Sequence, residues 1–230
     1  HNKKSKGELF FMISHKFKCV FVHVPKTAGQ SVEQFFKEKL EVNEKYCEEL
    51  LITKNDDPAK GPARLAHLRS EEYVACGHLD EDAYQHYFTF GFVRNPWQRL
   101  VSEYLHKKID RKMSLKEFVL EGLPDPDPLC DAYRHVIPQY DFLFDANGNQ
   151  NVDYIGRFEH LHESFAVICN KLELGAAQLP HKNSSYSPRR ALLRKCRHIF
   201  SGQKSRVKKH YTEYYDDELL KVVNTMYAKD

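Results

Sequence analysis

A strand, a tight loop and a helix follow one another near the amino terminus, and this unit constrains the fold more than any other feature of the sequence. Residues 18–24 read Lys-Cys-Val-Phe-Val-His-Val, a β-branched and aromatic run that predicts a buried strand. Residues 25–29 break the run, and from Gln30 onward apolar residues share one helical face, at Val32, Phe35, Phe36 and Leu40. A strand that passes directly into a helix aims free backbone N–H groups at one point, which suits phosphate or sulfate.

The side chains of this loop also suit an anion. Lys26 supplies a mobile positive charge, and Thr27 and Ser31 supply hydroxyl donors. The ATP-binding loop reads Gly-x-x-x-x-Gly-Lys-Ser/Thr, whereas here the lysine precedes Gly29 and the first glycine is missing. This order argues against an ATP-dependent small-molecule kinase, which we keep as an alternative. A plain strand-to-helix turn with a solvent-exposed lysine is a simpler alternative.

A second candidate anion site follows another predicted strand, residues 87–93. Arg94 lies where this strand stops, at the carboxyl edge of the sheet, where α/β proteins bind ligands. Asn95-Pro96 is typical of a helix start, and Ser102, two helical turns on, can present its hydroxyl to the same anion. Arg99 lies on a neighbouring face of this helix. An ion pair with a surface carboxylate is as good an interpretation of this residue as a contact to the anion.

The rest of the sequence continues to alternate strands with helices. It predicts a short strand at 73–77, a hairpin or strand–loop–strand from 141–145 and 152–158, a helix after the Ser114/Glu117 capping box, and helices at 163–174 and 217–228. We therefore expect an α/β, P-loop-like three-layer fold with a central, largely parallel sheet flanked by helices. One domain would cover residues 1–230, with residues 1–16 as a peripheral extension.

Composition excludes several classes of protein. The 230 residues are 41% hydrophobic and 29% charged, an ordinary globular balance that excludes wholesale disorder, collagen and coiled coil. The sequence has no apolar run of about 18 residues that could span a membrane. Its six cysteines are scattered, without a Cys-x-x-Cys pair, which disfavours zinc ribbons and favours free thiols in a reducing compartment.

Positive charge is concentrated in one stretch. Residues 174–212 contain ten Lys or Arg and no acidic residue, which leaves 25 basic and 32 acidic residues, a net charge of −7, for the rest of the chain. Such a basic zone indicates an anionic ligand at one place. A non-catalytic module that binds an anionic glycan or nucleic acid through this zone is a further alternative. Nucleic acid is disfavoured, because the zone does not interleave arginine with aromatic residues.

The two candidate anion sites together resemble those of sulfotransferases. The motifs are Pro-Lys-Thr-Ala-Gly-Gln-Ser at residues 25–31 and Arg-Asn-Pro-Trp-Gln-Arg-Leu-Val-Ser-Glu-Tyr at residues 94–104. The resemblance is closest to the carbohydrate branch, which includes the uronyl 2-O-sulfotransferases and many short bacterial sulfotransferases. Softer similarities extend it from about residue 18 to the C-terminus, at Gly77-His78-Leu79 and at residues 154–159, 179–185 and 214–219.

The resemblance implies a donor, 3′-phosphoadenosine 5′-phosphosulfate (PAPS), and its product 3′-phosphoadenosine 5′-phosphate (PAP). Lys26 would neutralise charge on the leaving oxygen, and Arg94 with Ser102 would bind the 3′-phosphate. The basic stretch from Lys182 onward would close over the nucleotide or face an anionic sugar. Six residues would wrap the 5′-phosphosulfate: Lys26, Thr27, Ala28, Gly29, Gln30 and Ser31.

Removing the proton of the acceptor hydroxyl calls for a base with a pKa near neutrality, which histidine supplies. By analogy with glycan sulfotransferases, His78 would be this base, with His181, Glu33 and Glu159 as rivals. His23 lies inside the predicted strand, and we interpret it as a structural histidine. A sulfuryl group carries less charge than a phosphoryl group, and no acidic pair adjoins the loop, so we expect no metal requirement.

The expected reaction is therefore in-line transfer of a sulfuryl group from PAPS to a hydroxyl, and the basic zone favours an anionic carbohydrate as acceptor. We expect no nucleic-acid partner and no stable membrane contact. The cytoplasm is the expected compartment, as for short bacterial sulfotransferases, and the Golgi lumen after removal of an anchor is the alternative. No motif in residues 41–63 or 120–139 indicates which acceptor binds. The sequence does not indicate the oligomeric state.

Overall fold

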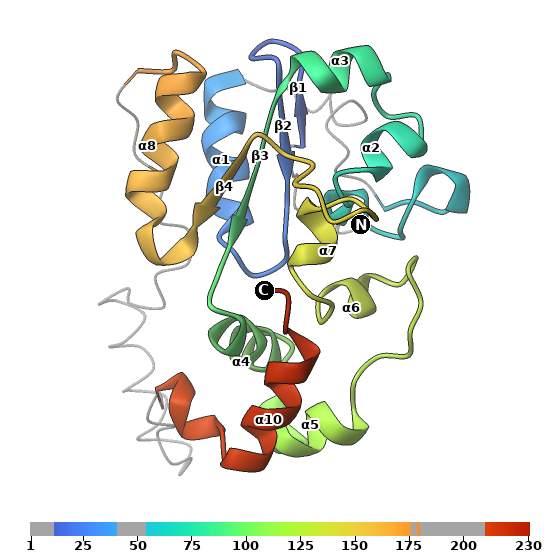
Figure 1. Ribbon diagram of the computed structural model, residues 1–230, viewed down its shortest axis with the longest axis vertical. Helices are drawn as coiled ribbons and strands as arrows, with labels where there is room; N and C mark the ends of the chain where they lie inside the picture. Colours follow the sequence, from blue (N-terminus) through green and yellow to red (C-terminus); the bar gives the residue numbers. More distant parts are fainter. Residues whose placement is uncertain (1–11, 41–53, 176–178, 180–209) are drawn as a thin grey trace, which may run out of the picture.

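The computed structural model describes residues 12–40, 54–175, 179 and 210–230. Within them one four-stranded sheet has the order β1-β2-β3-β4. β1 (Ile13–Ser14) runs antiparallel to β2 (Cys19–Val22), whereas β2, β3 (Phe88–Val93) and β4 (Tyr154–Arg157) are parallel to one another. Helices lie on both sides of the sheet (Figure 1). The predicted α/β fold with a largely parallel central sheet is confirmed.

The core is built from the aromatic residues of the central strands. The rings of Phe21 in β2 and Phe90 in β3 are fully buried and stack with their centroids 5.2 Å apart. On one side α1 (Gly29–Leu40) and α8 (Leu161–Lys171) cover the sheet, and their rings Phe35 and Phe165 meet at 4.9 Å. Full burial of each such ring stabilises the fold by about 2 kcal/mol. The strands are apolar on both faces because helices cover both faces.

The three parallel strands bring their carboxyl ends to one edge of the sheet. Val22 pairs with Gly91, and Val93 pairs with Arg157, so each strand stops near the same level. In Figure 1 this is the lower edge, just above α4 (Pro96–His106). The loop after β2, the start of α4 and the end of β4 therefore face a common region.

A second layer of helices packs beneath this edge. α4, α5 (Leu115–Glu121) and α10 (Asp217–Met226) share an apolar cluster that includes Leu100, Phe118 and Val223. The side chain of Asn95 accepts a hydrogen bond from the backbone N–H of Gln98, and Pro96 opens α4. Both the predicted cap of α4 and the predicted capping box of α5 are confirmed.

Short helices complete the described chain. Four are α-helical: α2 (Glu72–Ala75), α3 (Glu81–His86), α6 (Asp131–Arg134) and α7 (Tyr140–Leu143). Five are 3₁₀ turns: η2 (Pro58–Lys60), η3 (Leu65–His67), η4 (Ile109–Arg111), η5 (Phe158–His160) and η6 (Tyr211–Tyr214).

The predicted strand at 73–77 is wrong, because this segment forms α2. Tyr73 is fully buried and its hydroxyl donates to the carbonyl of Phe21, while Glu72 pairs through both carboxylate oxygens with the buried guanidinium of Arg134, at 2.6 Å each. These tertiary contacts outweigh the β propensity of the segment.

The predicted strand at 141–145 is also wrong in its first part, which forms α7. Only an isolated antiparallel bridge between Phe144 and Gln150 remains of the predicted hairpin. At the amino terminus, Met12 and Ile13 are buried and β1 joins the sheet, so this part of the predicted peripheral extension belongs to the core. The basic stretch from Lys182 to Lys209 lies outside the described residues.

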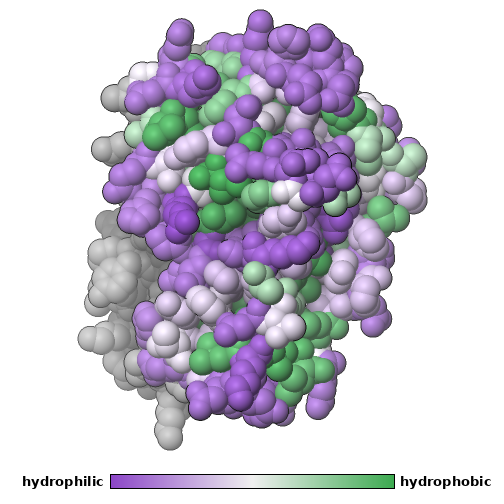
Figure 2. All heavy atoms as spheres, in the orientation of Figure 1, coloured by the Kyte–Doolittle hydropathy of each residue, from purple (hydrophilic) through white to green (hydrophobic). Residues whose placement is uncertain are grey.

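The face seen in Figure 2 is mainly hydrophilic, with hydrophobic side chains gathered in small separate patches. Large apolar side chains that are exposed come from different elements: Leu105, Leu120, Leu129 and Val167. Among the helices that the structure describes, none combines the length and the apolar character needed to cross a bilayer.

Candidate active site

The loop after β2, with the first turn of α1, forms the first candidate anion site; we call residues 23–31 the anion loop. Thr27 is fully buried and its hydroxyl donates to the carbonyl of Val24 at 2.8 Å, which closes the loop on itself. Lys26 and Ala28 both have positive φ angles, 71° and 77°. Such backbone conformations cost on the order of 1 kcal/mol or more in non-glycine residues and are typical of functional sites.

Lys26 is the cation of the anion loop. Its side chain is partly buried and, within the described part of the chain, its ammonium makes no hydrogen bond and no ion pair. Burial lowers its pKa, the carboxylate of Glu103 raises it, and the positive charges of Arg94 and Lys107 lower it. The loop therefore presents a positive charge that no described carboxylate contacts directly.

Arg94 connects the second candidate anion site to the first. Its Nη1 donates to the carbonyl of Lys26 at 3.3 Å, its Nε donates to Gln98, and its guanidinium lies 4.2 Å from the ring centre of Phe158. Burial lowers its pKa, and Glu159 raises it. Gln139 fixes its backbone by accepting from its N–H and donating to its carbonyl, both at 2.8 Å.

Ser102 and Arg99 lie on α4 as predicted, but in different surroundings. Ser102 is partly buried, and its hydroxyl bonds no other group that the structure describes, including Arg94. Arg99 is fully buried and donates to the carbonyls of His135 and Ile137. Among the described residues Arg99 therefore pairs with no surface carboxylate, and it holds α4 against the segment that follows α6.

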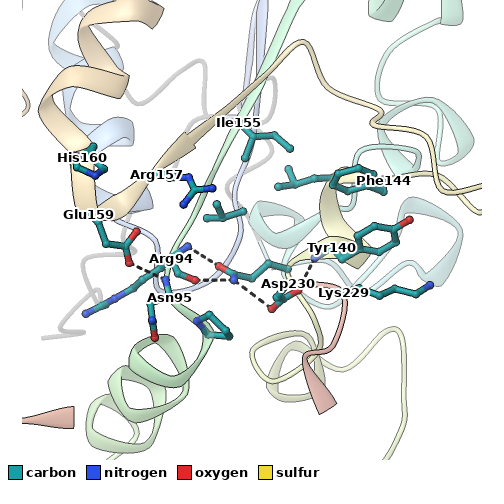
Figure 3. A pocket seen from close by; sticks show the side chains of 14 residues that line it. Arg94, Asn95, Tyr140, Phe144, Ile155, Arg157, Glu159, His160, Lys229 and Asp230 are labelled. Atoms are coloured by element: carbon teal, nitrogen blue, oxygen red, sulfur yellow. Dashed lines mark hydrogen bonds between the residues drawn. The ribbon is translucent and has the colours of Figure 1, made fainter. Parts of the chain in front are cut away.

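A cavity of about 550 Å³ opens between the ends of β3 and β4, beside Arg94 (Figure 3). Arg94 directly follows β3 and Arg157 is the last residue of β4, while Tyr140 and Phe144 form an aromatic wall on the other side. We call it the edge cavity. Its lining is Val93, Arg94, Asn95, Pro96, Gln139, Tyr140, Leu143, Phe144, Ile155, Arg157, Glu159, His160, Lys229 and Asp230. Its volume is within the range of small-molecule sites.

The two carboxylates of the edge cavity are occupied by backbone donors. Glu159 accepts from the N–H of Asn95 at 2.7 Å, and Asp230 accepts from the N–H of Tyr140 at 3.0 Å. The guanidinium of Arg157 has no hydrogen bond or ion pair among the described residues. The cavity thus offers positive charge and aromatic surface together, a combination suited to a nucleotide. The sequence carried no local signal of Arg157, which lies inside the predicted strand at 152–158 and is the last residue of β4.

Comparison with known proteins decides the family. The sequence profile described as "Sulfotransferase family" matches residues 10–230, nearly the whole chain. The chain belongs to the sulfotransferase family. An uncharacterized protein of Archaeoglobus fulgidus is 36% identical over 91 residues, which cover 38% of this chain and 69% of that protein. None of the solved structures matches. Sulfuryl transfer to a hydroxyl is therefore the class of reaction that the family assigns to this chain.

At and beside its anion loop, the sulfotransferase gathers three buried histidines, two buried carboxylates and the partly exposed carboxylate of Asp131. We call these residues the histidine cluster: His23, Glu33, His67, Glu103, Asp131 and His135. His67 Nδ1 lies 2.6 Å from Asp131, His135 Nδ1 lies 2.9 Å from Glu103, and His23 Nδ1 lies 3.1 Å from Glu33. The ring of His67 is edge-on to both other rings, with centroids 5.0 Å from His23 and 4.7 Å from His135.

Burial sets the protonation of His67. It lowers the pKa of His67, which keeps the imidazole neutral near pH 7. Burial alone would raise the pKa of Asp131 and of Glu103, but the hydrogen bonds and charges of the neighbouring histidines hold both below their usual range. His67, Asp131 and His135 place ligand atoms within 4.8 Å of one another, close enough to hold a metal ion.

His78, the predicted base, lies away from the anion loop of the sulfotransferase. Its Nε2 donates to the carbonyl of Lys60 at 2.7 Å, and the charges that act on it are those of Lys60 and Glu72. None of the charges that act on Lys26 belongs to this segment. In Figure 1 the turn between α2 and α3 lies to the right of the sheet, whereas the loop lies at the lower end of β2.

The rival bases that the sequence indicated have other partners. Glu33 lies beside His23, and Glu159 holds the start of α4. His23 is buried, as expected of a structural histidine, and His181 lies outside the described residues. Sequence reasoning missed His67, Asp131 and His135, because nothing in the local pattern distinguishes them from other polar residues.

Proposed function

We propose that this sulfotransferase transfers the sulfuryl group of PAPS to a hydroxyl of a carbohydrate. One observation supports the proposal above the others: the guanidinium of Arg94 reaches the backbone of Lys26, so the two candidate anion sites form one continuous surface. A single ligand with an anionic group at each end fits such a surface, and PAPS carries a 5′-phosphosulfate and a 3′-phosphate.

The cations of the site match the charges of this donor. In the proposal, Lys26, Thr27, Ala28, Gly29, Gln30 and Ser31 hold the 5′-phosphosulfate, and Arg94 with Ser102 holds the 3′-phosphate. The fit rests on two side chains, Lys26 and Arg94, that carry positive charge without a described ion pair. Because the hydroxyl of Thr27 already donates to Val24, we assign Thr27 to the shape of the loop and leave donation to the amide N–H groups and Ser31.

Catalysis of this reaction depends more on stabilising negative charge than on forming a covalent bond to the protein. In an in-line transfer the bond between sulfur and the bridging oxygen breaks while the acceptor oxygen attacks, and negative charge grows on the bridging oxygen. Lys26, carried by the strained loop and within the field of the Glu103 carboxylate, is placed to stabilise that charge. The acceptor proton passes to a histidine base.

The proposal of an anionic carbohydrate as acceptor rests on the sequence. The ten Lys and Arg residues between positions 174 and 212 carry enough positive charge to face a uronate or sulfated sugar as well as the donor phosphates. A phenol or steroid would gain nothing from this charge.

A transfer assay with ³⁵S-labelled PAPS tests the proposal. The acceptors are hyaluronan, alginate, a neutral cello-oligosaccharide and small alcohols, without added metal, and PAP binding is measured in parallel by calorimetry. We expect labelled product with a uronate polymer and PAP binding that Lys26→Ala weakens. Turnover of ATP with magnesium would support the kinase alternative. Retention of polyanion binding without transfer, unaffected by Lys26→Ala, would support a binding module.

A further inference from the structure

The histidine cluster contains a base candidate that the sequence did not reveal. We propose that His67, oriented by Asp131, is the general base that removes the proton of the acceptor hydroxyl, an inference that rests on the proposed function. The side chains belong to η3 and α6, 64 residues apart in sequence, and meet beside the anion loop.

Of the three histidines that are buried in the described chain, His67 has the shortest contact to a carboxylate, 2.6 Å from Nδ1 to Asp131, which leaves Nε2 as its second nitrogen. His23 has Nδ1 beside Glu33, and its Nε2 packs against Gly29 so closely that a β-carbon there would lie 1.8 Å away. His135 has Nδ1 at 2.9 Å from Glu103 and Nε2 at 3.6 Å from Asp131. His67 uses only Nδ1, and its Nε2 bonds no group in the described part of the chain.

The position of His67 is fixed from two sides by α6. The carboxylate of Asp131 accepts from its Nδ1 at 2.6 Å, and Nη1 of Arg134 donates to its backbone carbonyl at 2.8 Å. Arg134 is itself fully buried and held by Glu72. Because both the imidazole and the backbone of His67 are held, its Nε2 keeps one direction, as a catalytic base requires.

The cluster is linked to the anion loop by one packing contact and by one charge. His23, in edge-on contact with His67, packs on Gly29 at the start of α1. On the other side His135 lies beside Glu103, the carboxylate whose charge acts on Lys26. His67 therefore lies between the residues that shape the loop and those that set the charge of its lysine.

The proposed step is balanced within the site. The acceptor hydroxyl gives its proton to Nε2 of His67 while its oxygen forms a bond to sulfur. The bond between sulfur and the bridging oxygen of PAPS breaks, and PAP leaves with that electron pair. Asp131 accepts a hydrogen bond from Nδ1 before and after the transfer and stabilises the imidazolium that forms. Asp131 is therefore a positioning residue, and His67 is the catalytic one.

The test compares His67→Gln, Asp131→Asn and His78→Gln, with His86→Gln on the exposed surface of α3 as the matched control. The assay is ³⁵S transfer from PAPS to the polymer or alcohol that the wild type uses, together with PAP affinity. General-base catalysis contributes about 10²–10⁴ in rate. We expect His67→Gln to lose turnover on that scale and to bind PAP within about threefold of wild type. Asp131→Asn should lose less.

A second measurement keeps the base assignment independent of folding. Acceptor alcohols of increasing acidity are compared, since an acidic hydroxyl needs a base less. The rate of His67→Gln should depend more steeply on acceptor acidity than that of wild type. Full turnover in His67→Gln, or loss confined to His78→Gln, would overturn the inference. So would parallel loss of PAP affinity in His67→Gln, which would indicate a supporting role.

Two outcomes separate this inference from other possibilities. If wild type fails to bind PAP, the proposed function fails, and the base assignment with it. If wild type binds PAP and transfers sulfate while His67→Gln is unimpaired, only the base assignment fails. Chelator-sensitive activity together with a cobalt absorption band that is lost in His67→Gln would show that the cluster holds a metal ion, and would also overturn the inference.

Discussion

The imidazole of His23 occupies the space where Gly29 would carry a β-carbon. That carbon would come within 1.8 Å of Nε2 and within 2.3 Å of two ring carbons of His23. The glycine of the anion loop is thus required by a histidine six residues earlier, in addition to any ligand. The contact joins the end of the loop to the histidine cluster.

Gly29→Ala should therefore disturb the anion loop. A methyl group at this position forces His23 out of its packed site, which typically costs about 1–3 kcal/mol for overpacking in a core. We expect a lower melting temperature and PAP affinity reduced at least tenfold, measured by thermal unfolding and calorimetry. The double variant with His23→Ala should recover part of the affinity. Wild-type affinity in Gly29→Ala alone would show that the loop does not need this contact.

Lys26→Ala should abolish transfer. The lysine is the charge that we place on the leaving oxygen, and loss of one such stabilising group typically lowers turnover by about 10²–10³. Lys171→Ala, an exposed lysine near the end of α8, is the control of equal charge change. Steady-state rates with labelled PAPS measure both. Retained turnover in Lys26→Ala would show that Lys26 takes no part in the chemical step.

Arg94→Ala should weaken recognition of the 3′-phosphate specifically. Charge-assisted hydrogen bonds contribute about 1.5–3 kcal/mol, or roughly 10- to 100-fold in affinity. Wild type should prefer PAP to adenosine 5′-phosphate, which lacks the 3′-phosphate, and Arg94→Ala should lose most of this preference. Calorimetry with the two nucleotides measures it. An equal loss of affinity for both nucleotides would show that Arg94 maintains the shape of the anion loop and does not recognise the 3′-phosphate.

Stability should fall as the pH falls below about 6.5, partly because of His67. Burial lowers its folded-state pKa, so below the unfolded value of about 6.5 the unfolded chain binds a proton that the folded chain does not. The stabilising contribution is complete above that pH and is lost on acidification, at up to roughly 1 kcal/mol per pH unit. His78 and His106, whose pKa values burial also lowers, act in the same direction.

Urea unfolding between pH 7.5 and 5 measures this dependence. His67→Gln should flatten the slope relative to wild type, whereas His86→Gln should preserve it. Identical slopes in wild type and His67→Gln would mean that His67 does not remain neutral in the folded protein.

The parts of this site that the sequence predicts are those encoded locally. The buried strand, the loop with Lys26 and the capped helix after Arg94 each depend on neighbours within about ten residues, and parallel strand order brings them together. The segment at 73–77 was predicted wrongly because Tyr73 and Glu72 are fixed by partners more than fifty residues away. No local pattern reports such partners.

The histidine cluster illustrates the same limit. His67 and Asp131 are 64 residues apart, and neither lies in a segment whose sequence pattern indicates a catalytic role. The edge cavity likewise gathers side chains from four separate segments, among them Arg157 and the carboxyl-terminal Asp230. Sequence similarity points to His78, whereas the three-dimensional arrangement places His67 in contact with His23 at the start of the anion loop.

Cys19 gives this protein an internal reporter of local opening around β2. It pairs with Ser14 of β1 on one side and with Phe88 of β3 on the other, and its thiol is fully buried with a pKa raised by that burial. A maleimide can reach it only when the structure around β2 opens, since a protonated, covered thiol is inert. The labelling rate of Cys19 would thus time that opening, and a nucleotide that tightens the loop after β2 should slow it.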